Sequence, residues 1–265
     1  MKNRLSLSGK TALVTGASSG LGAEFARQLG AAGCDLILVA RREDRLQSLR
    51  QEVVAHHPVN IHVFPADLTK PDAPRKLYAD IKAADLSVDI LINNAGFGIY
   101  GAHATIPWEQ ERQMLMLDVM AVMQLTKLFL ADMLKRNAGY ILQLSSIGAY
   151  QASPTYAAYS AAKSFVLYFG EALNYELRNT NVSCTVLSPG VTATEFLQVS
   201  GQKPTLYQRM FMMQSSEVVR IGLQAMLKRK PSVVAGRMNA LMVWSNRLMP
   251  RRWSAAVTNS LMTMR

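Results

Sequence analysis

Two tyrosines and a lysine lie within nine residues, TYAAYSAAK at 155–163. If this stretch is helical, residues four apart share a face, so Tyr159 and Lys163 project side by side. The residue four positions after Tyr156 is Ser160, which leaves Tyr159 as the phenol that can pair with the ammonium. A free phenol has a pKa of about 10, and a neighbouring cation lowers that pKa. The spacing therefore predicts acid–base chemistry at Tyr159, with a surface phenol–ammonium contact as the alternative.

A glycine-rich turn, TGASSGLG at 15–22, follows a short apolar run and precedes a helical pattern. Gly16, Gly20 and Gly22 permit a tight turn and let the backbone approach a pyrophosphate. The N-terminus of the following helix offers free N–H groups to that anion. Such a turn can also serve helix–strand packing alone, but a strand before it and a helix after it favour a dinucleotide site.

The next apolar run ends in LVARRED, 38–44, without the acid that would hold the ribose 2′-hydroxyl of NAD. Arg41 and Arg42 stand there instead, and guanidinium groups suit a 2′-phosphate. Glu43 and Asp44 fall at the start of a predicted helix, where they complement its dipole. We therefore expect NADP as the cofactor, selected mainly by Arg41 with help from Arg42. The alternative is a solvated basic loop.

These groups need a scaffold that brings them together, and the apolar pattern predicts one. Short apolar runs alternate with helical patterns, and the runs cover 11–15, 35–40, 60–64, 88–93, 140–145, 182–188 and 232–235. Most are apolar throughout, which is typical of strands buried on both faces of a parallel sheet. The chain also lacks a Pro- or Gly-rich linker and any repeat. We expect an α/β fold: one doubly wound Rossmann domain over 1–236, with a seven-stranded parallel sheet and helices on both faces.

Several motifs, in this order, resemble the short-chain dehydrogenase/reductase family over about residues 8–236. They are TGASSGLG, Asp67 in PADLT, NNAG at 93–96, Ser146 in LQLSSIG, YxxxK at 159–163, and PG at 189–190 before VTATEF. The segments VARR and PGVTATEF are similar to those of a bacterial-type, NADP-preferring reductase subgroup. YxxxK alone is a common accident, whereas the ordered set is specific.

The resemblance implies an oxidoreductase that interconverts a carbonyl and a secondary alcohol by hydride transfer. Tyr159 would exchange a proton with the substrate oxygen, Ser146 would donate a hydrogen bond to it, and Lys163 would hold the nicotinamide ribose. Ser145 is expected to be structural, and no metal is expected. The implied cofactor-binding residues are Gly16, Ser18, Ser19, Gly20, Leu21, Gly22, Arg41, Arg42, Asp67, Leu68, Asn94, Ala95, Gly96, Tyr159, Lys163, Pro189, Gly190, Val191, Thr192 and Thr194. The alternative function is a non-catalytic NADP(H)-binding sensor or scaffold protein on the same fold.

One position departs from the family pattern. The family usually has an asparagine in its fourth helix, where it helps to hold a water that links the catalytic lysine to solvent. Counting back from Leu125 and Thr126 places Asp118 at that position. An aspartate accepts hydrogen bonds but lacks the amide donors, and if it were buried beside Lys163 it would favour the ammonium. We include Asp118 among the catalytic candidates; the alternative is a solvated helix residue in a different register.

In the family, the substrate pocket is shaped by the loop after NNAG, the segment IGAYQASPT and the residues after Thr194. Lys203 and Arg209 are the obvious anchors there for an anionic group. The remaining candidates are largely apolar, which indicates a hydrophobic carbonyl compound or alcohol. These candidates are Phe97, Ile99, Tyr100, Tyr150, Phe196, Leu197, Tyr207, Met210, Phe211 and Met212.

The formal net charge of +11 would suit nucleic acid, an acidic membrane surface or an anionic ligand. Without a zinc-finger or RNA-recognition signature, we expect no nucleic-acid partner. Cys34 and Cys184 lie in apolar, strand-like contexts typical of buried thiols in a reducing compartment. The first residues carry no long apolar run, and no stretch is a confident membrane span. We therefore expect a cytoplasmic protein, with peripheral membrane contact as an addition.

The segment 237–265 forms a separate C-terminal extension in this interpretation. It contains five arginines, two tryptophans and no acidic residue, and Pro250 is expected to split it into two short helices. Such a segment can lie in a membrane interface, or it can cover the substrate pocket or a neighbouring subunit. The resemblance also implies a homo-oligomer, a dimer or a tetramer, through the fourth and fifth helices.

Overall fold

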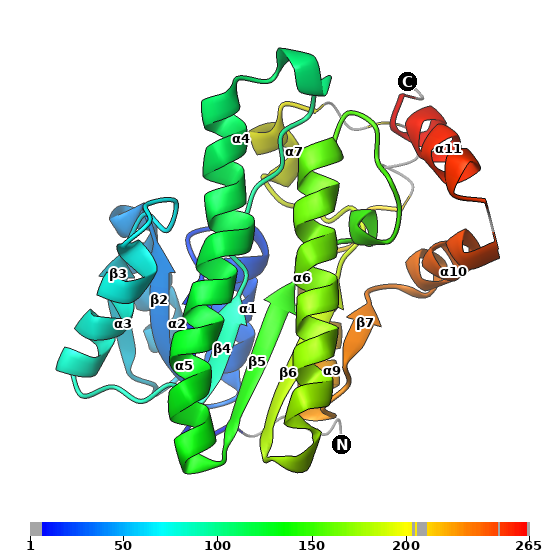
Figure 1. The fold of residues 1–265 in the computed structure, drawn as a ribbon. Helices are drawn as coiled ribbons and strands as arrows, with labels where there is room; N and C mark the ends of the chain where they lie inside the picture. The colour runs from blue at the N-terminus through cyan, green and yellow to red at the C-terminus, as the bar shows by residue number, and fades with distance from the viewer. Residues whose placement is uncertain (1–6, 203–204, 206–210, 249, 264–265) are drawn as a thin grey trace.

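The computed structural model of the chain describes residues 7–202, 205, 211–248 and 250–263. Seven parallel strands form one sheet in the order β3-β2-β1-β4-β5-β6-β7, with helices on both faces (Figure 1). The predicted fold class is therefore confirmed. The strands are β1 (Thr11–Thr15), β2 (Asp35–Ala40), β3 (Ile61–Pro65), β4 (Ile90–Asn93), β5 (Gly139–Leu144), β6 (Val182–Ser188) and β7 (Ser232–Val234).

Helices cover the sheet between the strands. The α-helices are α1 (Gly20–Ala31), α2 (Glu43–His56), α3 (Ala73–Ala83), α4 (Trp108–Leu115), α5 (Val122–Arg136), α6 (Ala157–Glu176), α7 (Phe196–Ser200), α9 (Ser215–Leu227), α10 (Arg237–Ser245) and α11 (Arg251–Thr263). A π-helical segment, η2 (Met116–Ala121), joins α4 to α5. The short 3-10 turns are η1 (His103–Thr105), η3 (Ile147–Tyr150), η4 (Leu177–Asn179) and η5 (Asn246–Leu248).

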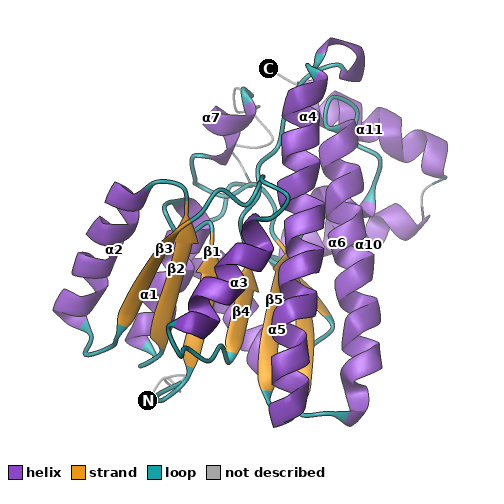
Figure 2. Cartoon of the chain, turned by 60° about the vertical axis from the view of Figure 1, so that its left-hand side comes forward, coloured by secondary structure: helices purple, strands orange, loops and turns teal. Residues whose placement is uncertain are grey.

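The core lies in two layers, one on each face of the sheet. Successive strand residues point to opposite faces, so Val14 belongs to the layer of α1, α2 and α9, while Leu13 belongs to the layer of α3, α5 and α6. In Figure 2, α3 and α5 lie in front of the orange strands, whereas α1 lies behind them. Burial on both faces explains why the strands are apolar throughout. Cys34 and Cys184 are buried in these layers as free thiols, and burial raises the pKa of each thiol to about 12.

The continuous helix Trp108–Arg136 contains an 18-residue window with a mean hydropathy of 1.7, so it is long and apolar enough to span a membrane, and among the described residues it is the only such helix. Its inner face carries Leu125, Phe129 and Met133, which pack into the core against the sheet. The apolar composition is that of a core helix of the Rossmann layer, and composition alone gives it the appearance of a span.

The carboxyl ends of β1 and β4 meet where the strand order reverses, which is where open α/β sheets bind their ligands. The Thr15 hydroxyl at the end of β1 accepts hydrogen bonds from the backbone N–H groups of Asn94 and Ala95, both at 3.0 Å. The Asn94 side chain in turn donates to the Thr15 carbonyl at 2.8 Å. These bonds fasten the NNAG motif to the strand that leads into the glycine turn.

The C-terminal extension begins directly after β7. Asn239 of α10 is buried and donates to the Ala235 carbonyl at 2.7 Å, and a Cβ at Gly190 would collide with its side chain. Pro250 separates η5 from α11, at the position where the sequence predicts a break. The extension thus packs against the PG motif at its start and protrudes beyond β7, at the right of Figure 1.

Candidate active site

The glycine turn between β1 and α1 adopts a conformation that requires glycine at two positions. Gly16 has φ +67° and Gly20 has φ +55°, both in the left-handed region that side chains disfavour. A Cβ at Gly22 would collide with the carbonyl oxygen of Gly16, so the third glycine closes the turn. Because α1 begins at Gly20, its N-terminal N–H groups lie at this turn and can receive an anion.

A cavity of about 830 Å³ opens at this carboxyl edge of the sheet. Every residue predicted to bind the cofactor lines it, with the exception of Gly22, which packs inside the turn instead. The bare glycine backbone, the helix N-terminus and the arginines at the end of β2 match the pyrophosphate and phosphate groups of a dinucleotide. The residues present therefore fit a nicotinamide dinucleotide.

The two arginines after β2 have different surroundings. Arg42 donates to the hydroxyls of Ser18 and Ser19 at 3.2 and 3.0 Å, and its guanidinium lies 3.5 Å from Glu195. Arg45 of α2 reaches the same carboxylate at 2.9 Å. Arg41 lines the cavity but makes no side-chain hydrogen bond or ion pair with the described residues.

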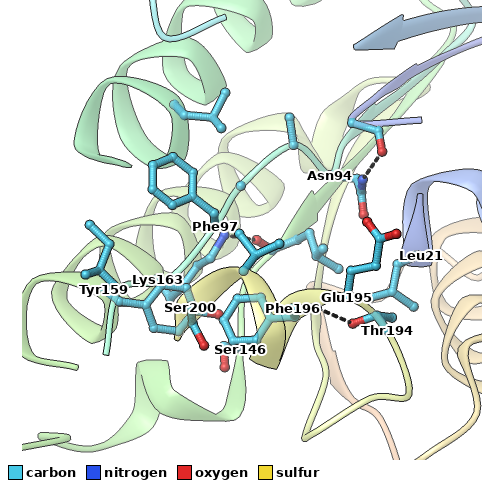
Figure 3. Close-up of a pocket in the computed structure, with 18 of the residues that line it drawn as sticks. Leu21, Asn94, Phe97, Ser146, Tyr159, Lys163, Thr194, Glu195, Phe196 and Ser200 are labelled. Atoms are coloured by element: carbon cyan, nitrogen blue, oxygen red, sulfur yellow. Dashed lines mark hydrogen bonds between the residues drawn. The ribbon is translucent and has the colours of Figure 1, made fainter. Parts of the chain in front are cut away.

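Glu195 and Arg45 are site residues that the sequence interpretation missed. Together with Arg42 they connect α2 to the segment after β6, across the outer edge of the glycine turn. The signal was present, since Glu195 directly follows Thr194 in VTATEF, but only the threonines of that motif were used. Figure 3 shows Glu195 beside Asn94, Leu21 and Thr194.

Ser146, Tyr159 and Lys163 line the same cavity (Figure 3). Ser146 follows the end of β5, whereas Tyr159 and Lys163 lie one turn apart on α6. The Ser146 hydroxyl accepts a hydrogen bond from the Gly148 N–H at 3.1 Å and also faces the Tyr159 phenol. Ser145 donates to the carbonyl of Lys163 at 2.8 Å, so this neighbouring serine fastens β5 to α6. The structure brings the predicted catalytic side chains together at one end of the cavity.

The pKa of the Tyr159 phenol shifts in the opposite direction to the sequence prediction. We expected the Lys163 charge to lower the pKa of the phenol, but the pKa of Tyr159 is raised well above its ordinary value. Burial is the largest cause, the charge of Asp118 adds to it, and the contact with Ser146 opposes both. The prediction is wrong because burial of the phenol outweighs the Lys163 charge, which the Asp118 carboxylate, 2.9 Å from the ammonium, also offsets.

That carboxylate belongs to Asp118, which decides between the two interpretations of this position. Asp118 is completely buried, so it is not a solvated helix residue. It lies in the π-helical segment η2, and its second oxygen accepts a hydrogen bond from the Phe97 N–H at 3.1 Å. Asp118 does not line the cavity and instead stands behind Lys163.

Aromatic rings form one wall of the cavity next to Tyr159. The ring centroids of Tyr100 and Tyr156 are 5.5 Å apart, those of Tyr156 and Tyr159 are 5.7 Å apart, and those of Tyr159 and Phe196 are 5.5 Å apart. Tyr156 is the residue before α6, and its hydroxyl lies 3.0 Å from Ser200 Oγ and 2.9 Å from Gln202 Oε1. Its phenol is therefore engaged in holding the segment around α7.

The lining partly corrects the expected substrate pocket. Phe97, Ile99, Tyr100, Phe196 and Leu197 line the cavity as predicted. The prediction is wrong for Tyr150, Phe211 and Met212, which do not line it; the Tyr150 ring packs against a small core cluster of Ala149, Leu167 and Val186. Tyr207, Met210, Lys203 and Arg209 lie outside the described residues. Polar side chains also contribute: Ser153, Ser200 and Gln202 come from the predicted segments, whereas Gln110, Gln113 and Ser160 lie outside them. Across the described part of the chain, no group of three or more His, Cys, Asp or Glu side chains could hold a metal ion.

Comparison with known sequences places this site among related proteins. The family model described as short chain dehydrogenase matches residues 10–205. A "Dehydrogenase/reductase SDR family protein 7-like" of Drosophila melanogaster is 34% identical over 199 residues, which cover 73% of this chain and 60% of that protein. The 17-beta-hydroxysteroid dehydrogenase type 3 of Mus musculus is 29% identical over 221 residues, which cover 82% of this chain and 71% of that protein. The chain thus spans only about 60% of the length of the insect relatives that it matches.

Solved structures share the fold over nearly the whole chain. A structure from a study of 7beta-hydroxysteroid dehydrogenase stereoselectivity superposes with a TM-score of 0.86 at 24% identity, covering 95% of this chain and 97% of that one. A short-chain dehydrogenase from Sphingobium yanoikuyae in complex with NADPH gives 0.80 at 29% identity, covering 91% and 95%. A bulky-bulky ketone specific alcohol dehydrogenase from Comamonas testosteroni gives 0.76 at 27% identity, covering 91% and 93%.

Proposed function

The chain belongs to the short-chain dehydrogenase family, and from that premise we propose that it is an NADP(H)-dependent oxidoreductase. It would interconvert a hydrophobic ketone and the corresponding secondary alcohol. One observation carries the proposal: Ser146, Tyr159 and Lys163 line the same cavity as the glycine turn and Arg41. A dinucleotide on the turn and a carbonyl compound beside Tyr159 would therefore share one continuous space.

Each catalytic side chain has a distinct task in this proposal. The nicotinamide, when bound, supplies a hydride to the carbonyl carbon or removes one from the alcohol carbon. Tyr159 passes its phenolic proton to the substrate oxygen in reduction and takes a proton back in oxidation. Ser146 donates a hydrogen bond to the same oxygen and stabilises the charge that develops there. Lys163 has three N–H donors, and one of them contacts the Leu144 carbonyl at 3.2 Å. Its remaining donors are available to Asp118 and to the cofactor ribose.

The proposed choice of NADP rests on the end of β2. No acid stands there to receive a ribose 2′-hydroxyl, and Arg41 lines the cavity without an ion pair to the described residues. A guanidinium in this position can bind a 2′-phosphate through charge-assisted hydrogen bonds. The NADPH complex of the related Sphingobium enzyme supports the assignment.

The proposed substrate class rests on the wall of rings and aliphatic side chains beside Tyr159. Tyr100, Tyr156 and Phe196 provide apolar surface next to the reacting position, and the polar side chains around them can orient further substrate oxygens. The names of two relatives, a mouse hydroxysteroid dehydrogenase and a bulky-ketone dehydrogenase, are consistent with a large apolar ketone.

A turnover assay with a matched pair of tyrosine variants tests the function. The protein is incubated with NADPH and a panel of steroid-like, aromatic and aliphatic ketones, aldehydes and diketones, and oxidation of NADPH is followed. Tyr159→Phe should lower turnover by at least about 10²-fold, because it removes the proton donor, while NADPH binding persists. Tyr156→Phe should retain most turnover, because that hydroxyl contacts Ser200 and Gln202 instead. Clear NADPH binding without reduction of any compound would favour the sensor or scaffold alternative.

A further inference from the structure

A buried ion pair lies directly behind the proposed proton donor. Asp118 Oδ2 is 2.9 Å from Lys163 Nζ, and the two side chains are 0% and 5% exposed. Lys163 also donates to the Leu144 carbonyl at 3.2 Å, while Asp118 Oδ1 accepts from the Phe97 N–H at 3.1 Å. Each charged group thus has a second, backbone partner, which holds the pair in one geometry. The pair is removed from water, so its charges are poorly screened.

The fold is shaped around this pair at two points. Asp118 lies in the only π-helical segment of the described chain, Met116–Ala121, between α4 and α5. At the end of β4, a Cβ on Gly96 would lie 2.9 Å from Asp118 Oδ1 and 3.0 Å from Lys163 Nζ. Any side chain at Gly96 would therefore displace one of the two groups. The helix distortion and the bare backbone of Gly96 together allow the Asp118 carboxylate to contact the Lys163 ammonium directly.

The direct contact changes what Lys163 does to Tyr159. The ammonium lies 5.7 Å from the centroid of the Tyr159 ring, where an unpaired cation would favour the phenolate. Burial is the largest cause that raises the pKa of Tyr159. The Asp118 carboxylate, which lies beside the ammonium, raises this pKa further. The pKa of Asp118 itself is raised above its ordinary value by burial, and the Lys163 charge and the Phe97 N–H oppose that rise by favouring the carboxylate.

Other titratable groups around the phenol do not cancel this effect. The Tyr156 ring adjoins Tyr159, and burial raises the pKa of Tyr156 to about 12, so this phenol adds no charge at ordinary pH. The helix α4, which also packs against α6, carries the buried Glu111, and this carboxylate lies 2.9 Å from His103. The neighbouring segment α7 contributes Phe196, which does not titrate. The remaining charges of the cavity lining lie at its cofactor end, on Arg41, Arg42, Asp67 and Glu195.

We propose that Asp118, through its direct ion pair with Lys163, is the positioning residue that sets this site for carbonyl reduction rather than alcohol oxidation. The proposal rests on the oxidoreductase function proposed above. In reduction the O–H bond of Tyr159 breaks, its proton goes to the carbonyl oxygen, and hydride with its electron pair reaches the carbonyl carbon from reduced nicotinamide dinucleotide. The resulting phenolate is reprotonated from solvent. Oxidation requires the phenolate at the outset, and the Asp118 charge disfavours it.

The variant Asp118→Asn tests the inference, because it removes the charge but keeps the size and the Oδ1 acceptor for the Phe97 N–H. With NADP(H) and one ketone–alcohol pair found in the turnover screen, kcat is measured against pH in both directions. In the profile of kcat against pH for alcohol oxidation, we expect the acid limb to move to lower pH by about one pH unit or more. Oxidation at neutral pH should rise roughly tenfold, and the alkaline limb of reduction should move in the same direction. Asp118→Ser is the second variant if the asparagine lowers the melting temperature.

The control is Asp132→Asn, which removes another carboxylate from the same helix, where Asp132 contacts Lys82 at 3.3 Å and Tyr78 at 2.9 Å. This variant should leave both pH profiles in place. If Asp118→Asn changes only the height of the profiles and not their limbs, Asp118 is merely structural and the inference is overturned. If the wild type reduces no compound, the proposed function fails, and the inference is judged by phenolate absorbance. Tyr159 ionisation, isolated by subtracting the matching Tyr159→Phe spectra, should then begin at lower pH in Asp118→Asn, and equal onsets would reject the inference.

Discussion

At the scale of single residues, the adjacent arginines Arg41 and Arg42 carry the same charge but have different contacts. Arg42 is already engaged with Ser18, Ser19 and Glu195 at the edge of the glycine turn. Arg41 lines the cavity, and its guanidinium has no hydrogen-bond or ion-pair partner among the described side chains. Binding of a 2′-phosphate by Arg41 needs no ion pair to be broken, whereas binding by Arg42 competes with Glu195. Cofactor preference should therefore depend more on Arg41 than on Arg42.

We expect Arg41→Ala to weaken NADPH binding by roughly 10- to 100-fold and to leave NADH binding nearly unchanged, because a charge-assisted hydrogen bond contributes about 1.5–3 kcal/mol. Dissociation constants for both cofactors, measured by quenching of protein fluorescence, check this. Arg50→Ala, which removes an exposed arginine from α2, is the matched control. A wild type that binds NADH and NADPH equally would contradict the assignment, as would an unchanged preference in Arg41→Ala.

At the scale of elements, the C-terminal extension combines an apolar stripe with charged residues that are all basic. Met238, Leu241 and Trp244 recur every three residues on α10, Leu248 continues the stripe in η5, and each is more than half exposed. The chain has no acidic residue after Glu217. An exposed apolar stripe with tryptophan on a basic segment suits the interface of an anionic membrane, where apolar burial and charge attraction add. We propose that this face gives the protein, which we expect in the cytoplasm, a peripheral contact with such a membrane.

Vesicle co-sedimentation tests this contact with the full chain. The wild type should pellet with anionic vesicles and remain in solution with zwitterionic ones, and the double variant Leu241→Glu/Trp244→Glu should remain in solution with both. Val54→Glu, on the exposed face of α2, should behave as the wild type. If no protein pellets and the double variant loses its oligomeric state, the stripe is a subunit contact and the membrane proposal fails.

At the scale of the whole molecule, the outer faces of η2, α5 and α6 form an exposed apolar surface. Met120, Met123, Phe165, Tyr168 and Tyr175 are all exposed there, and α5 and α6 lie side by side in both views of the chain (Figures 1 and 2). Exposed apolar surfaces of this kind are typical of protein or membrane contacts. We expect a homo-oligomer, a dimer or a tetramer, that pairs these helices with those of a second copy.

Light scattering at micromolar concentration should report a dimer or a tetramer, and Phe165→Glu should shift it towards the monomer, because the substitution places a charge in an apolar contact. Val54→Glu again serves as the control on a distant helix. A monomeric wild type would refute the prediction. An oligomer that is unaffected by Phe165→Glu would place the interface on another surface.

Much of this protein could be predicted from sequence because the relevant signals are local. The apolar runs 11–15, 35–40 and 182–188 coincide with β1, β2 and β6, since strands buried on both faces must be apolar along their whole length. The glycine turn can be recognised in the sequence because glycine adopts its left-handed backbone angles without the steric cost that other residues incur. The four-residue spacing of Tyr159 and Lys163 sets them side by side on any helix.

Only the tertiary structure decided how these groups act on one another. Asp118 and Lys163 come from separate helices, and their contact depends on a π-helical distortion and on the bare backbone of Gly96. Neither feature can be recognised from a periodic pattern in the sequence. The same holds for Arg42 and Glu195, which meet only because the sheet brings the ends of β2 and β6 to one edge. The direction of the Tyr159 pKa shift was mispredicted for this reason. The four-residue spacing shows that the Lys163 cation is near Tyr159. The burial of the phenol and the opposing Asp118 carboxylate, however, arise only in the packed site.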